Sequence, residues 1–220
     1  MDALSSVKAV IFDVDGTLYC ERRLRRHMAL EAFLSLARGR LHLQDLRIIH
    51  HFRCIRESLS DLQVPGIEER QYAVTASLLD VPVQKVRNVV REWLVERPLR
   101  YLTVCRSPGV VELFEALKKN RLPVGIFSDY PPEEKLHALG LQPDCIACGS
   151  DPEVDALKPH PKGLLSLAAR LQVPVDMCLM VGDRDEKDGE AARRAGMKYL
   201  VVRRREQNRF FLQLKDSLTI

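Results

Sequence analysis

The stretch from Ala9 to Leu18 constrains the fold of this 220-residue chain most strongly, because four apolar residues lead directly into two carboxylates. The apolar run, Ala9 to Phe12, predicts a strand that is buried on both faces of a parallel sheet. Side chains alternate along a strand, so Asp13 and Asp15 point to the same side at its carboxyl end. Carboxylates this close persist where a cation neutralises them, or where they divide the work of nucleophile and proton carrier. The alternative, from these residues alone, is an Asp-Gly turn that closes a hairpin.

The second half of the chain alternates between helical and extended patterns. Helices are predicted over residues 110–119, 132–139, 161–171 and 187–195, and strands over residues 123–128, 145–148, 178–181 and 198–202. Strands that alternate with helices pair in parallel, so the sequence predicts an α/β fold with a doubly wound parallel sheet. The mixed composition of residues 203–220 favours no particular element.

Apolar side chains recur at helical spacing in the segment between the first strand and this α/β pattern. One stripe contains Leu24, Met28, Phe33 and Leu36, and another contains Leu46, Ile49, Phe52, Ile55 and Leu59. Each stripe predicts an amphipathic helix. A third helix is predicted over residues 68–79, and a fourth opens at Pro82, in the favoured first turn, and continues through Leu94.

These helices interrupt an α/β pattern that begins with the first strand and resumes after Pro108. We therefore predict a core domain, residues 1–19 and 104–220, and an inserted helical domain, residues 20–103. A chain of 220 residues fits one or two domains of about 150 residues each.

Candidate functional side chains lie at or just after the ends of predicted strands. Asp13 and Asp15 follow the first strand, Ser128 ends the second, Lys158 lies in the loop after the third, and Asp183 follows the fourth. Because the strands of one parallel sheet end at the same edge, these side chains can converge. Taken singly, Ser128 is better explained as a strand end and Lys158 as an exposed loop lysine, and Asp183 is compatible with a helix-start acid.

Four segments that contain these residues follow one another along the chain. They are Asp13-Val14-Asp15-Gly16-Thr17-Leu18, Phe127-Ser128-Asp129, Leu157-Lys158-Pro159, and Val181-Gly182-Asp183 with Asp188. In this order they resemble the signatures of the haloacid dehalogenase superfamily, whose members are mostly magnesium-dependent phosphohydrolases. The resemblance covers nearly the whole chain, and it is to phosphatase-like members with an inserted helical cap, such as phosphoglycolate phosphatase. It implies a Rossmann-like core.

The resemblance also implies a reaction, the hydrolysis of a phosphate monoester through an aspartyl-phosphate intermediate. Asp13 is the implied nucleophile. Asp15 is the implied acid, which protonates the departing alkoxide and later takes a proton from the attacking water. Ser128 would donate a hydrogen bond to a phosphoryl oxygen, and Lys158 would place a positive charge beside the nucleophile.

The implied cofactor is Mg²⁺, a hard cation that oxygen ligands select. Its implied ligands are the Asp13 carboxylate, the Asp15 backbone carbonyl and Asp183, with Asp188 binding through water or orienting a ligand. Asp185 and Glu186 offer further carboxylates, so the acid that joins Asp183 stays open, although the family's spacing favours Asp188. The role of Asp129 is also open, since many members carry Asn or another neutral residue there.

Asp15 separates related activities within this superfamily. A dehalogenase needs no acid to protonate a halide, and P-type ATPases carry Thr at the equivalent place. Asp15 therefore favours a phosphatase or a phosphomutase, which share all four segments. A catalytically inactive binding protein is a further alternative, but such a protein has no need to retain nucleophile, acid, lysine and metal ligands together.

The composition narrows the partners of the chain. The formal net charge is +4 and the pI is near 8.8, so the chain lacks the strong basic excess of nucleic-acid binders. It also lacks the aromatic residues that such proteins interleave with their basic ones. No apolar run reaches the roughly 18 residues that span a membrane, and the first six residues do not resemble a signal peptide. We expect a cytoplasmic monomer or homodimer that acts on a small phosphorylated metabolite and binds neither nucleic acid nor membrane.

Two clusters of arginines stand out, Arg22, Arg23, Arg25 and Arg26, and then Arg203, Arg204 and Arg205. Solvated helix or strand ends are the simplest explanation for both. The first cluster lies just beyond the first connection to the helical insert, so one or two of its members could reach a second anionic group on the substrate.

Overall fold

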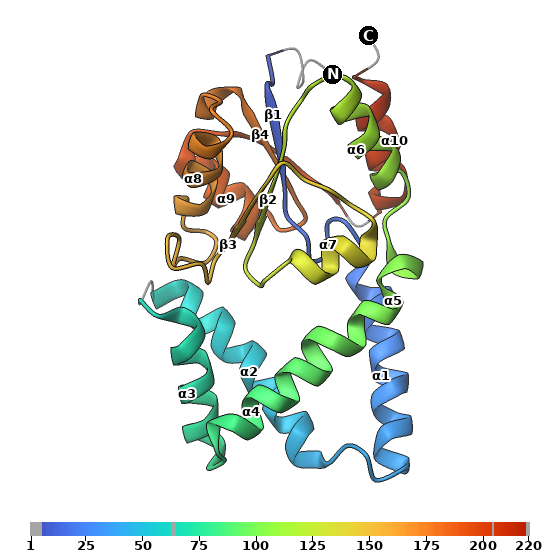
Figure 1. The fold of residues 1–220 in the computed structure, drawn as a ribbon, viewed down its shortest axis with the longest axis vertical. Coiled ribbons are helices and arrows are strands. Elements are labelled where there is room, and N and C mark those ends of the chain that lie inside the picture. The colour runs from blue at the N-terminus through green and yellow to red at the C-terminus, as the bar shows by residue number, and fades with distance from the viewer. Residues whose placement is uncertain (1–5, 63–64, 204, 219–220) are drawn as a thin grey trace.

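The computed structural model describes residues 6–62, 65–203 and 205–218. It consists of an α/β part and a helical insert that begins after the first strand (Figure 1). The insert lies beyond the carboxyl ends of the strands, and we call this side of the sheet the sheet edge. Residues 1–5 and 219–220, which belong to the predicted core domain, and Arg204 of the second arginine cluster lie outside the described residues.

Among the described residues the sheet has five parallel strands in the order β3-β2-β1-β4-β5. They are β1 (Ala9–Phe12), β2 (Val124–Ser128), β3 (Cys145–Cys148), β4 (Cys178–Gly182) and β5 (Lys198–Val201). The apolar, fully buried β1 lies at the centre, with Val10 opposite Val124 of β2 and Ile11 opposite Met180 of β4. The predicted doubly wound parallel sheet is confirmed, with helices packed on both of its faces. Buried apolar strands need such cover on each face.

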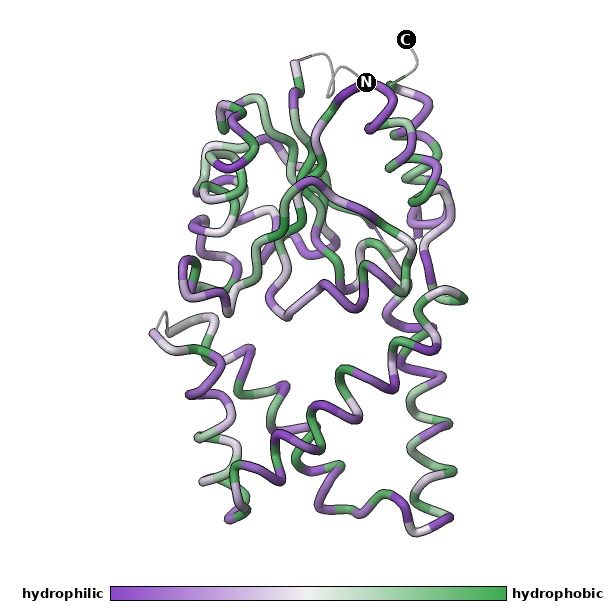
Figure 2. The backbone as a smooth tube through the Cα atoms, in the orientation of Figure 1, coloured by the Kyte–Doolittle hydropathy of each residue, from purple (hydrophilic) through white to green (hydrophobic). Residues whose placement is uncertain are grey.

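The helices and short turns of the α/β part are α6 (Val110–Lys119), α7 (Glu133–Leu139), α8 (Lys162–Arg170), η2 (Val175–Met177), η3 (Asp185–Gly189), α9 (Glu190–Ala195) and α10 (Gln207–Asp216). Alternate residues of β1 point to opposite faces. Phe12 joins a core with Leu113 of α6 and Phe211 of α10 on one face, and Ile11 joins a core with Leu164 of α8 on the other. Hydrophobic residues accordingly concentrate along the strands (Figure 2).

The C-terminal helix α10 was not predicted from the sequence. Its Phe211 is fully buried against the sheet, and it packs beside α6 (Figure 1). Gln207 at its start donates to the backbone carbonyl of Gly16 at 2.8 Å and to the Ser107 hydroxyl at 3.1 Å. The helix therefore depends on contacts with distant residues, which its own mixed pattern does not reveal.

The insert contains α1 (Glu21–Ala37), α2 (Leu43–Leu62), α3 (Ile67–Leu79), α4 (Val83–Val90), the π-helical turn η1 (Arg91–Glu96) and α5 (Arg97–Cys105). The predicted fourth helix continues further than expected, through η1 and α5. Pro98 has no N–H to donate to the carbonyl of Leu94, so the wider turns of η1 absorb the missing α-helical bond. The predicted boundary at residue 103 falls within α5. Within the described residues, no helix is long and apolar enough to cross a membrane.

Two connections between insert and core lie side by side. Tyr19 and Arg106 form an isolated antiparallel bridge, and the Cys20 amide donates to the Cys105 carbonyl at 2.8 Å. The chain therefore enters and leaves the insert at one place.

A second set of contacts joins insert and core at the start of α3. Leu59 and Ile67 of the insert pack against Leu157 of the core. The Asp155 carboxylate accepts hydrogen bonds from the amides of Gly66 at 2.8 Å and Ile67 at 3.2 Å, which satisfies free donors at the helix N-terminus. The insert is thus held against the core at a point separate from its covalent connections.

The packing of α8 on the sheet predicts that Gly163 has no room for a side chain. A Cβ atom at this position would overlap the ring of the fully buried Phe127. Gly163→Ala should lower the free energy of unfolding by about 1 to 3 kcal/mol, although Ala is the better helix former. Urea denaturation would measure this loss, with Ser166→Ala in the same helix as control. A Gly163→Ala protein of unchanged or higher stability would contradict the close approach.

Candidate active site

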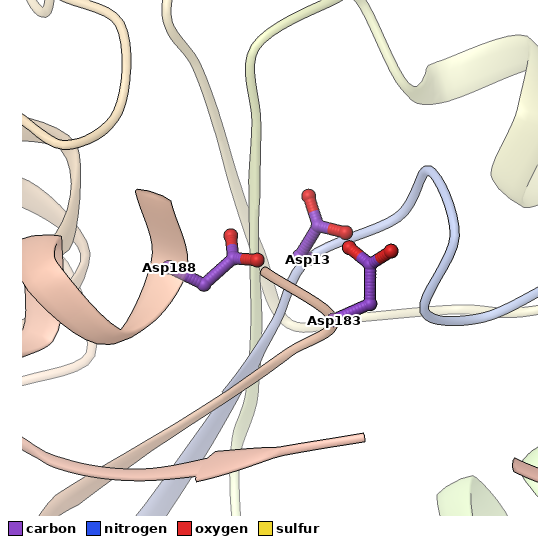
Figure 3. A group of neighbouring side chains, drawn as sticks. All are labelled: Asp13, Asp183 and Asp188. Atoms are coloured by element: carbon purple, nitrogen blue, oxygen red, sulfur yellow. The ribbon is translucent and has the colours of Figure 1, made fainter. Parts of the chain in front are cut away.

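The carboxylates of Asp13, Asp183 and Asp188 meet at the edge of the sheet that faces the insert (Figure 3). Asp13 follows β1, Asp183 follows the neighbouring β4, and Asp188 lies on η3 directly after β4. One oxygen of each side chain lies within 4.8 Å of an oxygen of each of the others. Asp13 and Asp188 are buried, and Asp183 is half-buried. Hard oxygen donors this close together can hold a cation such as Mg²⁺.

Asp188 is the acid that joins Asp13 and Asp183 in this cluster. Asp185, which the sequence left as an alternative, is exposed and pairs with Arg193 at 3.1 Å. Glu186 is also exposed. The first turn after β4 thus directs one acid inward and two toward solvent.

Lys158 lies between two of these carboxylates. Its Nζ atom donates to Oδ1 of Asp13 at 2.5 Å and to Oδ1 of Asp188 at 2.7 Å, and 2% of the residue is exposed. Burial lowers the pKa of the ammonium, but Asp13 and Asp188 hold it well above its usual range. Lys158 is therefore a buried, fixed positive charge rather than an exposed loop lysine.

Negative charge still exceeds positive charge in the cluster. Burial raises the pKa of Asp13 to about 8, and repulsion from Asp188 and Asp183 adds to the rise against the attraction of Lys158. Burial and Asp188 together raise the pKa of Asp183 to about 6. One lysine does not balance three carboxylates away from water, so a divalent cation fits the site by charge as well as by donor type.

The turn after β1 brings its backbone close to the cluster. Gly16 has φ +94°, a left-handed conformation, and a Cβ atom there would overlap the Asp183 carboxylate. The turn also directs the Thr17 hydroxyl to Oδ2 of Asp13 at 2.8 Å. Only glycine can adopt this φ at position 16 and leave room for the Asp183 carboxylate. Both oxygens of Asp13 therefore have a donor, Thr17 on one and Lys158 on the other.

Asp15 has a different set of partners. Lys135 of α7 donates to both of its oxygens, at 2.6 and 2.7 Å, and the Tyr19 hydroxyl donates to Oδ1. Burial alone would raise the pKa of Asp15, but Lys135 and Tyr19 lower it below its usual value. Asp15 is therefore ionised in this arrangement. Sequence reasoning missed Lys135, for which the only signal was a lysine in the helix that follows Ser128.

Ser128 and Asp129 lie at the end of β2. Ser128 is fully buried, and its Oγ atom accepts a hydrogen bond from the Tyr130 amide at 3.3 Å. Asp129 accepts a hydrogen bond from the Lys158 amide at 3.0 Å, so it fixes the backbone that carries the buried lysine. This contact supplies a structural reason for the acid whose role the sequence left open.

A cavity of about 1040 Å³ lies between the sheet edge and the insert. The core contributes Asp13, Asp15, Tyr130, Lys135, Lys158 and Asp183 to its lining, and the insert contributes largely apolar side chains, among them Met28, Ile49, Phe52, Trp93 and Leu94. Of the first arginine cluster, Arg25 lines this cavity and pairs with Glu21 at 2.7 Å. Arg22, Arg23 and Arg26 instead line a smaller, separate cavity at the connections.

The pKa shifts predict how pH affects stability in the absence of a divalent cation. Folding raises the pKa of Asp13 to about 8 and that of Asp183 to about 6, both from 3.8, so the folded state binds more protons than the unfolded state between these values. These groups therefore make stability fall as pH rises from about 4 to about 8. Mg²⁺ favours the ionised carboxylates, so the Tm increase on adding Mg²⁺ to EDTA-treated protein should grow over this interval.

Thermal unfolding in EDTA and in Mg²⁺ across this pH range would measure the effect. Asp183→Asn should reduce both the pH dependence and the Mg²⁺ response, since it removes one titrating ligand. A Mg²⁺ response that is constant or decreases toward high pH would contradict the expected charge imbalance.

Comparisons with known proteins agree with this geometry. The family of haloacid dehalogenase-like hydrolases matches residues 7–196. A glyceraldehyde 3-phosphate phosphatase of Methanopyrus kandleri is 26% identical over 90% of this chain and 84% of its own length. An N-acetylmuramic acid 6-phosphate phosphatase of Pseudomonas aeruginosa is 28% identical over 90% and 82%, and a phosphoglycolate phosphatase of Xylella fastidiosa is 27% identical over 89% and 80%.

Solved structures share the fold. The HAD-hydrolase YfnB of Bacillus subtilis, bound to magnesium, superposes with a TM-score of 0.71 at 15% identity, over 97% of this chain and 99% of that one. A HAD phosphatase of Thermococcus onnurineus superposes with a TM-score of 0.61 at 24% identity, over 90% and 87%. Because the family match extends over most of the chain and over every strand of the described sheet except β5, this chain belongs to the haloacid dehalogenase-like hydrolases, as the order of its four signature segments predicted.

Proposed function

We propose that this hydrolase is a Mg²⁺-dependent phosphatase that acts on a small phosphorylated metabolite through an aspartyl-phosphate on Asp13. The observation that carries the proposal is the buried contact of Asp13 with Lys158 beside the carboxylates of Asp183 and Asp188. A phosphate monoester is itself negatively charged, so a carboxylate can attack it only where cations and donors offset both charges. The phosphatase names of the relatives support the same class of reaction.

Asp13 is the proposed nucleophile because its carboxylate is held by donors on both oxygens. One oxygen attacks phosphorus, the bond from phosphorus to the ester oxygen breaks, and the alkoxide leaves with the bonding electrons. Water then attacks the phosphorus of the acyl phosphate, which releases inorganic phosphate and restores Asp13. Lys158 offsets charge beside the reacting oxygen, and the Ser128 hydroxyl, which accepts from a backbone amide, keeps its proton for a phosphoryl oxygen.

Asp13, Asp183 and Asp188 are the proposed side chains that hold Mg²⁺, together with the backbone carbonyl of Asp15. Bound Mg²⁺ supplies the positive charge that lets a phosphoryl group approach a carboxylate. The pKa values of Asp13 and Asp183, raised by burial and by repulsion from neighbouring carboxylates, support this assignment, since a nearby cation would favour the ionised forms and offset the rise.

Asp15 is the proposed acid and base of the two half-reactions. Its contacts with Lys135 and Tyr19 keep it ionised, so it must gain a proton before it can protonate the leaving alkoxide. Lys135 lines the cavity that admits the substrate, and an incoming phosphate competes with Asp15 for its ammonium. We infer that Lys135 withdraws from Asp15 when substrate binds.

We also propose that residues 20–103 act as a cap that selects the substrate. The groups proposed to contact the phosphoryl group, Asp13, Ser128 and Lys158, all come from the α/β part, whereas the insert lines most of the rest of the cavity. Contacts with the part of the substrate that differs between metabolites would therefore come from the insert. A monomer or homodimer in the cytoplasm remains our prediction.

The nucleophile assignment predicts that Asp13→Asn lowers kcat for an aryl phosphate by about three orders of magnitude or more, because the nearly isosteric amide cannot form the acyl phosphate. Asp15→Asn should also fail with alkyl phosphates but should accumulate phosphoenzyme from aryl phosphates, whose leaving groups need no proton. Steady-state rates and intact-protein mass spectrometry would measure both effects. An Asp13→Asn protein that retains wild-type activity, with Mg²⁺ present, would exclude this mechanism.

The contact between Lys135 and Asp15 predicts a shift in the pH profile. Lys135 lowers the pKa of Asp15 in the free enzyme, so Lys135→Met should raise that pKa and move the high-pH limb of kcat/KM for an alkyl phosphate, which reports the free enzyme, to higher pH. Lys135→Arg keeps the charge and serves as control. Identical high-pH limbs in the wild type and the Met variant would show that Asp15 does not deliver the proton.

A further inference from the structure

Arg56 is a buried cation whose hydrogen-bonding capacity is mostly unused. It lies on α2, and 4% of its surface is exposed. Its Nη1 atom donates to Oε1 of Gln71 at 2.9 Å, but Nε and Nη2 are buried without a partner among the residues that the structure describes. Unpaired buried donors on a charged group are costly, so these two indicate an acceptor that does not belong to the chain.

Neighbouring side chains hold the guanidinium in one orientation. Gln71 of α3 is fully buried, and its Nε2 atom donates to the carbonyl of Phe52 at 2.7 Å, which directs its Oε1 atom to Arg56. On the core side, the ring of Tyr130 stacks on the guanidinium, with 4.4 Å between the ring centroid and Cζ. The group is therefore ordered before any ligand binds.

The two unpaired atoms define the kind of ligand. Nε and Nη2 share one edge of the planar guanidinium, and their N–H bonds run parallel. This edge matches two oxygens of one carboxylate or phosphate, which it binds through paired, charge-assisted hydrogen bonds. A neutral hydroxyl or carbonyl would satisfy only part of it.

Arg56 lines the same cavity as Asp13 but faces other strands. Burial raises the pKa values of Tyr130, just after β2, and of Cys148, at the end of β3, and the charge of Arg56 opposes the rise at both. Asp13 follows β1, which lies one strand from β2 and two from β3. Strands lie about 4.8 Å apart, so across the sheet Arg56 is offset from Asp13 by about 5 to 10 Å.

Other cations that line the cavity are paired or exposed. The pairs are Lys158 with Asp13 and Asp188, Lys135 with Asp15, Arg184 with Glu57, and Arg25 with Glu21. Arg53, one turn before Arg56 on α2, also lines the cavity but is exposed to solvent. In the described part of the lining, Arg56 is thus the buried cation with donors to spare.

We propose that Arg56 binds a second anionic group of the substrate, a carboxylate or phosphate carried a few atoms from the phosphoryl group that Asp13 accepts. This inference rests on the proposed phosphatase function and narrows its substrates to phosphate monoesters that carry a second oxyanion. The sequence suggested that the first arginine cluster could contact a second anionic group. The proposal assigns that contact to Arg56 on α2 instead.

A series of three matched substrates tests the proposal: propyl phosphate, 3-phosphooxypropionate and propane-1,3-diyl bisphosphate. The wild type should show kcat/KM about tenfold or more higher for at least one of the charged substrates than for propyl phosphate, and the preferred one identifies the second group. Arg56→Gln, which keeps a polar group next to Gln71, should bring that ratio close to one, a loss of about tenfold or more, mainly through KM. Arg56→Lys keeps the positive charge but lacks the two parallel N–H donors, so it should retain part of the ratio.

Arg53→Gln removes an arginine from the same helix and cavity and should leave the ratio near that of the wild type, because an exposed charge is screened by solvent. A purely structural role for Arg56 would instead change kcat/KM equally for all three substrates and lower the Tm. Equal changes, or a wild type that does not distinguish the substrates, would overturn the proposal.

Calorimetric titration separates this inference from the phosphatase function. If the wild type hydrolyses none of the three esters, the proposed function fails, but Arg56 can still be tested by binding. Asp13→Asn protein should bind at least one of the two charged esters about tenfold more tightly than propyl phosphate, and adding Arg56→Gln should remove the difference. Equal affinities in the Asp13→Asn protein would reject the second-anion site.

Discussion

The interaction on which the rest of the site depends is the buried contact between Lys158 and the carboxylates of Asp13 and Asp188. Burying like charges together is unfavourable unless an opposite charge is held among them. The surrounding structure meets that condition, since Asp129 fixes the Lys158 backbone and the Gly16 turn clears space for Asp183. The remaining excess of negative charge is what gives the site its capacity for a cation.

Asp13 and Asp15 are two residues apart yet have opposite electrostatic environments. Asp13 shares one lysine with other carboxylates, and its pKa is raised to about 8, whereas Asp15 has Lys135 to itself and its pKa is lowered. In pairs of acids whose pKa values are driven apart, the acid with the raised pKa usually carries the proton and the other stays ionised. The proposed roles therefore need a cation that keeps Asp13 ionised and a substrate that draws Lys135 of α7 away from Asp15.

The helical insert turns an open sheet edge into an enclosed site. Its connections at Tyr19 and Arg106 lie together, and the contact of Asp155 with the start of α3 holds it at a second point. Between these points lies the cavity, in which the charged core groups face mostly apolar side chains of the insert. Arg56 is an exception, a cation brought over the core by α2 and stacked on Tyr130. Selectivity would then arise where insert and sheet edge meet.

The sequence by itself determined the parallel sheet, its helical insert and the convergence of Asp13, Lys158 and Asp183, because apolar strands and the residues at their ends leave a local pattern and parallel strands end on the same side of the sheet. The tertiary structure placed Asp188, which the family's spacing favoured, in the cluster in preference to Asp185. Only the tertiary structure showed that Lys135 holds Asp15 and that Arg56 keeps two buried donors without a partner among the described residues. These side chains sit on helices or helical turns whose local pattern is compatible with a solvated face. Their roles arise from packing between elements that are far apart in the chain, so the local spacing of residues does not predict them.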